Sequence, residues 1–460
     1  MTAHAPVLDE APPVAEPAPA TQAWPAPKTA WRTLWVLSLV LGLSQIDRNI
    51  LSLLLQPIKQ DLRFTDAQMG ILIGLAFSII YLFLSFPLSL LSDRRSRKTM
   101  IAIGVAVWSL ATAACGLARS FWPLFIARAG VGAGEAVNGP ATYSLLADTF
   151  PREKLPRAMA ILNIGFVGGT AISLIIGGIV IAALSKVHVT LPILGPMHTW
   201  QLVFFVVGLP GLLVSLLMMT LTEPARRGVG GRSGAERVPF WEVFRFLALN
   251  WRFYGCMFPS VFLTGVVSYG SQNFRAAFFQ RTYHWPSQQY ALVTGLVSLA
   301  ASPLGLIAGT WLSERWNRTH DDGNMRVALF ANVVSIPFAV AGPLMPNPWL
   351  SMACAAAGTA LVLTAAPPLV AAMQSITPGN VRAQVNSLYL LLFSGITGII
   401  GPWFIGWLTD LQHDETRLGF VIAMTSAIAM PISALIMSFA VKPFGRLIAG
   451  IKQEEAAAAR

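Results

Sequence analysis

Twelve apolar segments of about 20 residues or more follow one another along this chain of 460 residues. A segment of that length crosses the hydrocarbon core of a bilayer as an α-helix. The chain is 55% hydrophobic and 12% charged, whereas soluble domains contain roughly 25% charged residues. We therefore predict an all-α membrane protein with 12 transmembrane helices. The predicted spans are 33–57, 68–92, 99–118, 121–147, 156–184, 199–221, 251–281, 288–313, 326–344, 348–373, 383–409 and 418–441.

The basic residues are distributed unevenly between the loops on the two sides of these spans. Of the 32 lysines and arginines, 23 lie in the termini and alternate loops on one side, and six lie in the loops on the other. Basic loops stay in the cytoplasm, which predicts a multi-pass protein of the cell inner membrane with both termini cytoplasmic. The net charge of +11 is then a topology signal, and we expect no nucleic-acid partner.

A Gly- and Arg-rich stretch separates six spans from six. The predicted divisions are a disordered cytoplasmic tail (1–32), two six-helix bundles (33–221 and 251–442), a cytoplasmic linker (222–250) and a cytoplasmic tail (443–460). The final stretch is either a short helix on the inner leaflet or a solvated tail. The loop sequence SDRRSRK recurs as SERWNRT 221 residues later. Such a repeat is typical of transporters that rock two bundles about a central site.

Two acids and two bases interrupt apolar spans: Asp47, Arg48, Arg128 and Glu135. A charge at the bilayer centre costs roughly 2.5–3.5 kcal/mol on insertion scales, so such residues pair, face water or have a function. Counting at 1.5 Å per residue places Asp47, Arg48 and Glu135 near the midplane. The pattern predicts a polar pathway through the membrane.

Motifs for enzymes and cofactors are absent from the sequence. It contains no GxxxxGK[ST], HExxH or GxSxG, and its three cysteines fall in apolar spans without metal-site spacing. The segment GVGAGE follows no strand, so close helix packing explains its small residues better than dinucleotide binding. We expect neither enzyme activity nor a cofactor nor a metal.

The loop and span motifs resemble the major facilitator superfamily. SLLSDRRSRK matches that family's loop 2–3 motif except that Ser89 and Ser96 replace glycines, and Arg128 with Gly132 matches its helix 4 pattern. The resemblance implies two six-helix bundles with pseudo-two-fold symmetry and a monomeric protein. It also implies that helices 1 and 4 line a central cavity and therefore bring the four buried charges together.

Within that superfamily the chain resembles the Spinster branch. The residues that carry this resemblance are Asp47 and Arg48, the following LSLLLQPIKQDL, and RAGVGAGEA on the fourth span. The resemblance implies proton-driven transport of lysolipids or sphingolipid-like amphiphiles by alternating access. The alternatives are a proton-coupled transporter of small organic anions or drugs and a passive lipid facilitator.

We assign expected roles to the charged residues. Glu135 and Asp47 would carry protons with Arg128 as their counter-charge, because burial favours a neutral carboxyl and a nearby arginine favours a charged one. A static salt-bridge cluster is the alternative. Arg48 would bind a substrate anion, unless it only neutralises Asp47. Arg275 either has a gating or substrate role or extends to lipid headgroups. The predicted substrate-binding residues are Arg48, Arg128, Glu135, Asn138 and Arg275.

A second group of charges lies in the predicted cytoplasmic loops. The resemblance implies that these residues form a gate network that favours an outward-open state, while their alternative role is to set topology. The predicted gate residues are Asp93, Arg94, Arg97, Asp148, Arg157, Glu314 and Arg315.

Overall fold

The computed structural model describes residues 24–92, 95–151, 153–187, 189–191, 195–226, 240–378 and 381–458. Two of the predicted gate residues, Asp93 and Arg94, lie outside this part of the chain, as do residues 1–23 of the predicted tail and residues 227–239 of the predicted linker. The described chain is almost entirely helical, which confirms the predicted fold class.

The first half of the chain forms ten helices and one short hairpin among the described residues. Several predicted spans contain a local break, such as the one before Pro210, where a proline opens the second part of the span. The helices are α1 (Pro27–Leu53), α2 (Leu55–Leu62), α3 (Asp66–Ile73), α4 (Leu75–Ser92), α5 (Arg97–Cys115), α6 (Phe121–Glu135), α7 (Asn138–Thr149), α8 (Leu155–Leu184), α9 (Thr199–Gly208) and α10 (Pro210–Met219). Strands β1 (Val189–Leu191) and β2 (Gly195–Met197) pair antiparallel.

The second half begins with a short helix and continues with long ones. Its elements are α11 (Phe240–Leu249), α12 (Trp251–Tyr283), α13 (Ser287–Asn317), α14 (Gly323–Ala341), η1 (Gly342–Leu344), α15 (Pro348–Ile376), α16 (Arg382–Leu390), the π-helix η2 (Leu391–Ile396), α17 (Thr397–Leu411), η3 (Glu415–Arg417) and α18 (Leu418–Ala458).

Two predicted terminal boundaries differ from the structure. Helix α1 begins at Pro27 rather than at residue 33, because a proline is well tolerated in the first helical turn, where its missing N–H has no partner to lose. Helix α18 continues to Ala458, so described residues of the predicted 443–460 tail extend the last span without a break.

Ten helices in the described ranges are long and apolar enough to cross a membrane. The two other predicted spans, 121–147 and 251–281, coincide with α6–α7 and with α12. Helices α6 and α7, of 15 and 12 residues, are each shorter than 18 residues, and α12 is less apolar than the ten. The structure thus places a helix at each of the twelve predicted spans, and ten of them meet the length and hydropathy criterion.

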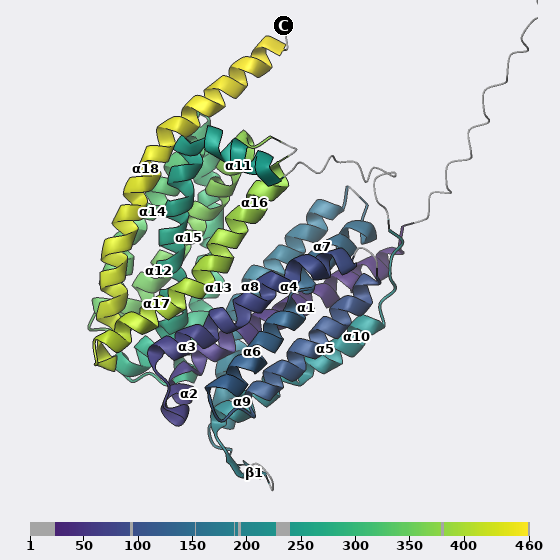
Figure 1. Cartoon of the computed structure of the whole chain (residues 1–460), viewed down its shortest axis with the longest axis vertical. Helices are drawn as coiled ribbons and strands as arrows, with labels where there is room; N and C mark the ends of the chain where they lie inside the picture. The colour runs from purple at the N-terminus through teal and green to yellow at the C-terminus, as the bar shows by residue number, and fades with distance from the viewer. Residues whose placement is uncertain are drawn as a thin grey trace, which may run out of the picture.

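The helices form two bundles that approach each other at one end and diverge at the other (Figure 1). We call the end with α2 and the β1–β2 hairpin the hairpin end, and the end from which α11 and the last turns of α18 project the linker end. Helix α3 packs on α17, and α8 packs on α13. A Cβ added at Gly70 would lie 2.4 Å from the Pro402 carbonyl oxygen, and one at Gly406 would lie 2.3 Å from that of Asp66. Glycines therefore allow α3 and α17 to pack backbone to backbone.

Candidate functional site

The first part of the site is an ion pair between α1 and α6. Arg48 donates to Glu135 Oε2 from Nη2 at 2.6 Å and from Nε at 2.8 Å, and the Ser44 hydroxyl donates to the same oxygen at 2.8 Å. The Glu135 side chain is 1% exposed and that of Arg48 is 36% exposed. Glu135 is the last residue of α6, directly before the break that separates α6 from α7. The arginine thus connects a buried acid to a more open space.

Asp47 and Arg128 lie beside this pair, but among the described residues no ion pair links their two side chains. Arg128 Nη1 donates to the backbone carbonyl of Asp47 at 3.2 Å, and both residues are buried. Asp47 Oδ1, Arg128 Nε and Glu135 Oε1 are buried without a hydrogen-bond partner among the described atoms. The arginine bonded to Glu135 is Arg48, whereas Arg128, the expected counter-charge of Glu135 and Asp47, contacts the Asp47 backbone.

Aromatic rings on α4 cover the two arginines. The Arg48 guanidinium carbon lies 4.7 Å from the centroid of the Phe77 ring and 5.5 Å from that of Tyr81, and the Arg128 guanidinium carbon lies 5.7 Å from the Phe77 centroid. Cation–π contacts of this kind stabilise a guanidinium that has lost water. Asn138, another predicted substrate residue, is buried and accepts a hydrogen bond from the Thr142 hydroxyl within α7 at 2.9 Å.

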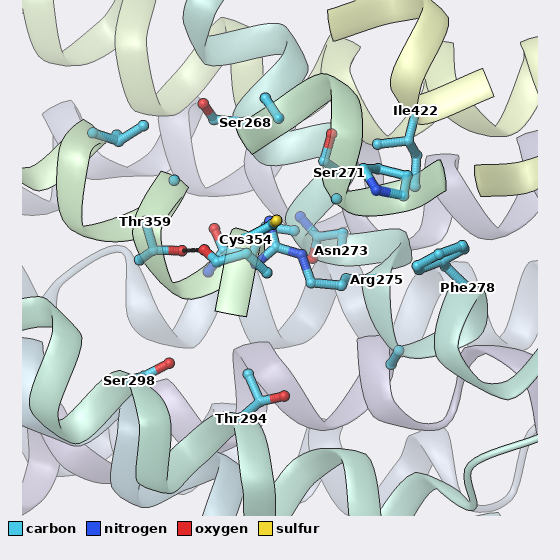
Figure 2. A pocket seen from close by; sticks show the side chains of 18 of the residues that line it. Ser268, Ser271, Asn273, Arg275, Phe278, Thr294, Ser298, Cys354, Thr359 and Ile422 are labelled. Atoms are coloured by element: carbon cyan, nitrogen blue, oxygen red, sulfur yellow. Dashed lines mark hydrogen bonds between the residues drawn. The ribbon is translucent and has the colours of Figure 1, made fainter. Parts of the chain in front are cut away.

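The second part of the site is a cavity of about 380 Å³ on the side of the C-terminal bundle. Its wall comes mainly from α12, α13, α14, α15 and α18, with α1 and α8 completing it. Figure 2 shows Arg275 in its middle, near Cys354 and Asn273. The labelled polar lining residues of the figure are Ser268, Ser271, Asn273, Thr294, Ser298, Cys354 and Thr359.

Arg275 is the single charged residue among those that line this cavity. It is half-buried, and no ion pair is recorded for it in the described part of the chain. The Arg275 side chain therefore faces the cavity and does not extend to lipid headgroups. The neighbouring Asn273 accepts a hydrogen bond from the Ser52 hydroxyl at 2.7 Å, which connects α12 to α1. Helix α1 thus contributes both to the ion pair and, through Asn49 and Ser52, to the cavity wall.

A third group of charges joins the two bundles at the hairpin end. Asp66 accepts two hydrogen bonds from Arg281, at 2.6 and 2.9 Å, and pairs with Lys59 at 2.9 Å, while Lys59 also pairs with Glu415 at 2.9 Å. Asp410 accepts from the backbone N–H groups that begin α3, at 2.9 and 2.8 Å. We call Lys59, Asp66, Arg281, Asp410 and Glu415 the hairpin-end network. Sequence reasoning missed it, although the charges alternate in sign at the ends of adjacent spans.

We expect Asp66→Asn to open the hairpin end. Asparagine cannot neutralise Arg281 and Lys59, and breaking a buried ion pair on one side costs roughly 3–5 kcal/mol. Spin labels at the exposed positions Thr65 and Thr416, one in each bundle, should report a several-fold larger population of long distances in the variant. Asp414→Asn is the control, because Asp414 is exposed and its recorded ion pair is with Arg417 in the same loop. Equal distance distributions in all three proteins would exclude a gating role for Asp66.

The predicted gate residues of the linker end come together only in part. Arg97 is buried and pairs with Asp148 and, at 3.0 Å, with Glu223, which lies two residues after the end of the sixth predicted span. Arg157 instead lies over the Trp31 ring and Arg315 over that of Trp311. No ion pair is recorded for Glu314 among the described residues.

Glu223 keeps its charge in this network. Burial raises the pKa of its carboxyl, but hydrogen bonds from the Lys98 N–H and from Arg97 and Ser96 outweigh burial and lower the pKa below its usual value. A lowered folded-state pKa adds stability above the unfolded-state pKa, and this is lost as the pH falls through the folded-state value. The contacts of Glu223 should therefore be intact at neutral pH.

Comparisons with known proteins agree with the motifs. The family description Major Facilitator Superfamily matches residues 37–402. The chain is 24% identical over 394 residues to an MFS-type efflux pump of Mycolicibacterium smegmatis, covering 85% of this chain and 86% of that protein. It is 28% identical over 336 residues to protein spinster homolog 1 of Mus musculus, covering 70% of this chain but only 60% of that relative.

The fold is also that of a solved transporter. The crystal structure of a bacterial homolog of the human lysosomal transporter Spinster, in an inward-facing and unoccupied conformation, superimposes with a TM-score of 0.76 at 24% identity. The match covers 92% of this chain and 98% of that one. The predicted resemblance to the superfamily and to Spinster proteins is thus confirmed.

Proposed function

Because this chain belongs to the Major Facilitator Superfamily of membrane transporters, we propose that it moves lysolipid or sphingolipid-like amphiphilic anions by proton-coupled alternating access. In this proposal it acts as a monomer in the cell inner membrane with both termini cytoplasmic, and the linker end faces the cytoplasm. The observation that carries the proposal is Arg275, a lone cation in a cavity without an acidic lining residue.

The cavity fits an anionic headgroup. A guanidinium binds phosphate or carboxylate through two parallel hydrogen bonds, and hydroxyl groups nearby add further donors. Thr294, Ser298 and Thr359 also line this cavity (Figure 2). The Thr294 hydroxyl donates to Met352 Sδ at 3.6 Å and the Thr359 hydroxyl to the Ala355 carbonyl at 2.8 Å, which leaves the Ser298 hydroxyl as a candidate donor to the anion. Its volume of about 380 Å³ lies in the range of roughly 300–1,000 Å³ typical of small-molecule sites.

The surroundings also suit an acyl chain. Phe338, Leu363 and Met430 belong to the cavity wall, so its lining is mixed rather than purely polar. An amphiphile would find apolar contacts on the cavity wall while its charge reaches Arg275.

We propose that protons act through Glu135. When Glu135 takes a proton it loses the charge that holds Arg48, and the guanidinium, already partly exposed, becomes available to a substrate anion. When the proton leaves, the Arg48–Glu135 pair re-forms and displaces the anion. Asp47 and Arg128, buried beside the pair, would set the electrostatic field in which this exchange occurs.

The alternative functions are transport of small organic anions or drugs and passive movement of lipid. To distinguish them, we would measure the flux of a labelled lysophospholipid into proteoliposomes with and without an imposed ΔpH. The flux of a labelled small dicarboxylate would be measured in the same way. We expect lysophospholipid flux that ΔpH stimulates. Lysophospholipid flux indifferent to ΔpH would favour a passive facilitator, and dicarboxylate flux alone would favour the small-anion transporter.

A further inference from the structure

An open groove at the linker end runs between the loop that leads into α14 and the C-terminal part of α18. Figure 1 shows α18 along the outer edge of the C-terminal bundle, and α14 packs against it. Gly445 and Ala449 of α18 belong to the groove lining, and a Cβ added at Gly445 would lie 3.3 Å from the Asp322 Cβ. Because the side chains of α18 are small at this point, space for a ligand remains beside the helix.

Positive charge predominates in this groove. The exposed bases of its lining are Arg326, Lys442 and Arg446. The two acids of the lining are each neutralised by a base, since Asp322 pairs with Arg326 at 2.6 Å and Asp321 pairs with Lys452. Neither Lys442 nor Arg446 forms an ion pair with a described residue. These two side chains are therefore available to an anion.

Exposed apolar side chains continue the line of these two bases along α18. Lys442 lies four residues before Arg446, Phe439 lies three residues before Lys442, and Leu435 lies four residues before Phe439. Residues spaced by three and four lie on one face of an α-helix. Phe439 and Leu435 are 63% and 59% accessible, so this face changes from basic to apolar within one turn.

Helix α14 shows the same change beside α18. Arg326 is exposed, and Phe330 and Val333, four and seven residues further along the same face, are exposed apolar residues. A change from basic to apolar side chains marks the boundary between lipid headgroups and acyl chains, because lysine and arginine direct their charges to the interface. The groove thus lies at the headgroup level, directly beyond an apolar surface that two helices form.

We propose that this groove binds an anionic phospholipid of the leaflet at the linker end, with the headgroup phosphate between Lys442 and Arg446. Arginine binds phosphate through two parallel hydrogen bonds, and lysine binds it as a point charge. The acyl chains would lie along Phe439 and Leu435 of α18 and Phe330 of α14. A soluble phosphate would use the charges alone, whereas the apolar surface continuous with them fits a lipid. The site is separate from the transport cavity and does not depend on which substrate is carried.

Native mass spectrometry tests the need for the two bases. The protein would be released from nanodiscs of phosphatidylcholine and phosphatidylglycerol in equal amounts, and the lipid molecules that remain bound would be counted. We expect Lys442→Gln/Arg446→Gln to retain phosphatidylglycerol several-fold less often than wild type, with retention of phosphatidylcholine unchanged. Undiminished retention of phosphatidylglycerol in this variant would overturn the proposal.

The matched control is Lys28→Gln/Arg32→Gln. Lys28 and Arg32 are also an exposed lysine and arginine four residues apart, at the start of α1, and the exposed Trp35 follows them on the same face. Neither residue lines the groove. The control should retain phosphatidylglycerol as wild type does, and an equal loss in both variants would contradict a specific site.

Labelling of the wild-type chain avoids the risk that a variant misfolds. A water-soluble amine reagent should modify Lys442, relative to Lys28 in the same sample, several-fold more slowly in nanodiscs that contain phosphatidylglycerol than in nanodiscs of phosphatidylcholine. Equal relative rates in the two lipids would argue against the proposal. Inorganic phosphate added to phosphatidylcholine nanodiscs should not protect Lys442, and protection equal to that by phosphatidylglycerol would show a site for soluble phosphate instead.

Discussion

Glu135→Gln should abolish the stimulation of transport by ΔpH, reducing proton-driven flux by at least about tenfold. Glutamine has nearly the same shape as glutamate but cannot exchange a proton, so it cannot alternate between holding and releasing Arg48. The measurement is uptake of a labelled lysophospholipid into proteoliposomes with an imposed ΔpH, for wild type and variant. Exchange of substrate without ΔpH should persist, because the cavity around Arg275 is unchanged.

The matched control for this variant is Ser44→Ala. Ser44 donates one hydrogen bond to the same carboxylate oxygen that Arg48 contacts, at 2.8 Å, but carries no proton in the proposed exchange. We expect Ser44→Ala to retain ΔpH-stimulated uptake. Full stimulation in Glu135→Gln would contradict the coupling role and leave the Arg48–Glu135 pair as a static contact between α1 and α6.

The sequence predicts the membrane spans and the buried charges well, because both follow from local physical rules. A segment of about twenty apolar residues is stable only in a bilayer or in a protein core. A charged residue within such a segment must form an ion pair, face water or have a function. The proximity of Arg48 and Glu135, 87 residues apart, could be expected from the family resemblance. The sequence could not predict which arginine bonds to Glu135, because the choice depends on side-chain directions at the helix break after Glu135.

The hairpin-end network shows where sequence reasoning ends. Asp66 and Arg281 are 215 residues apart and belong to different bundles, so neither hydropathy nor charge counting brings them together. The positive-inside rule counts the basic residues of each loop singly and predicts topology, not pairing. Their pairing depends on how the two bundles meet, and this is set by close backbone packing such as that at Gly70 and Gly406.

Arg275→Gln should weaken lysophospholipid binding by about tenfold to a hundredfold, since hydrogen bonds to charged groups contribute about 1.5–3 kcal/mol. The native Cys354 offers the measurement, because it lines the same cavity and lies near Arg275 in Figure 2. Saturating lysophospholipid should protect Cys354 from a thiol reagent in wild type, and the concentration needed for protection should rise in the variant.

Two further variants separate recognition of the anion from support of the fold. Arg275→Lys keeps the charge but loses the planar fork, so we expect protection to need an intermediate concentration. Arg63→Gln removes an exposed arginine outside the cavity lining and should leave protection unchanged. If lysophospholipid protected Cys354 in the Arg275→Gln variant at the same concentration as in wild type, Arg275 would not hold the anion. Arg48, once released from Glu135, would then be the candidate cation. The lysophospholipid concentration that protects Cys354 thus shows where the headgroup is held. It distinguishes the cavity of the C-terminal bundle from the ion pair of the N-terminal bundle.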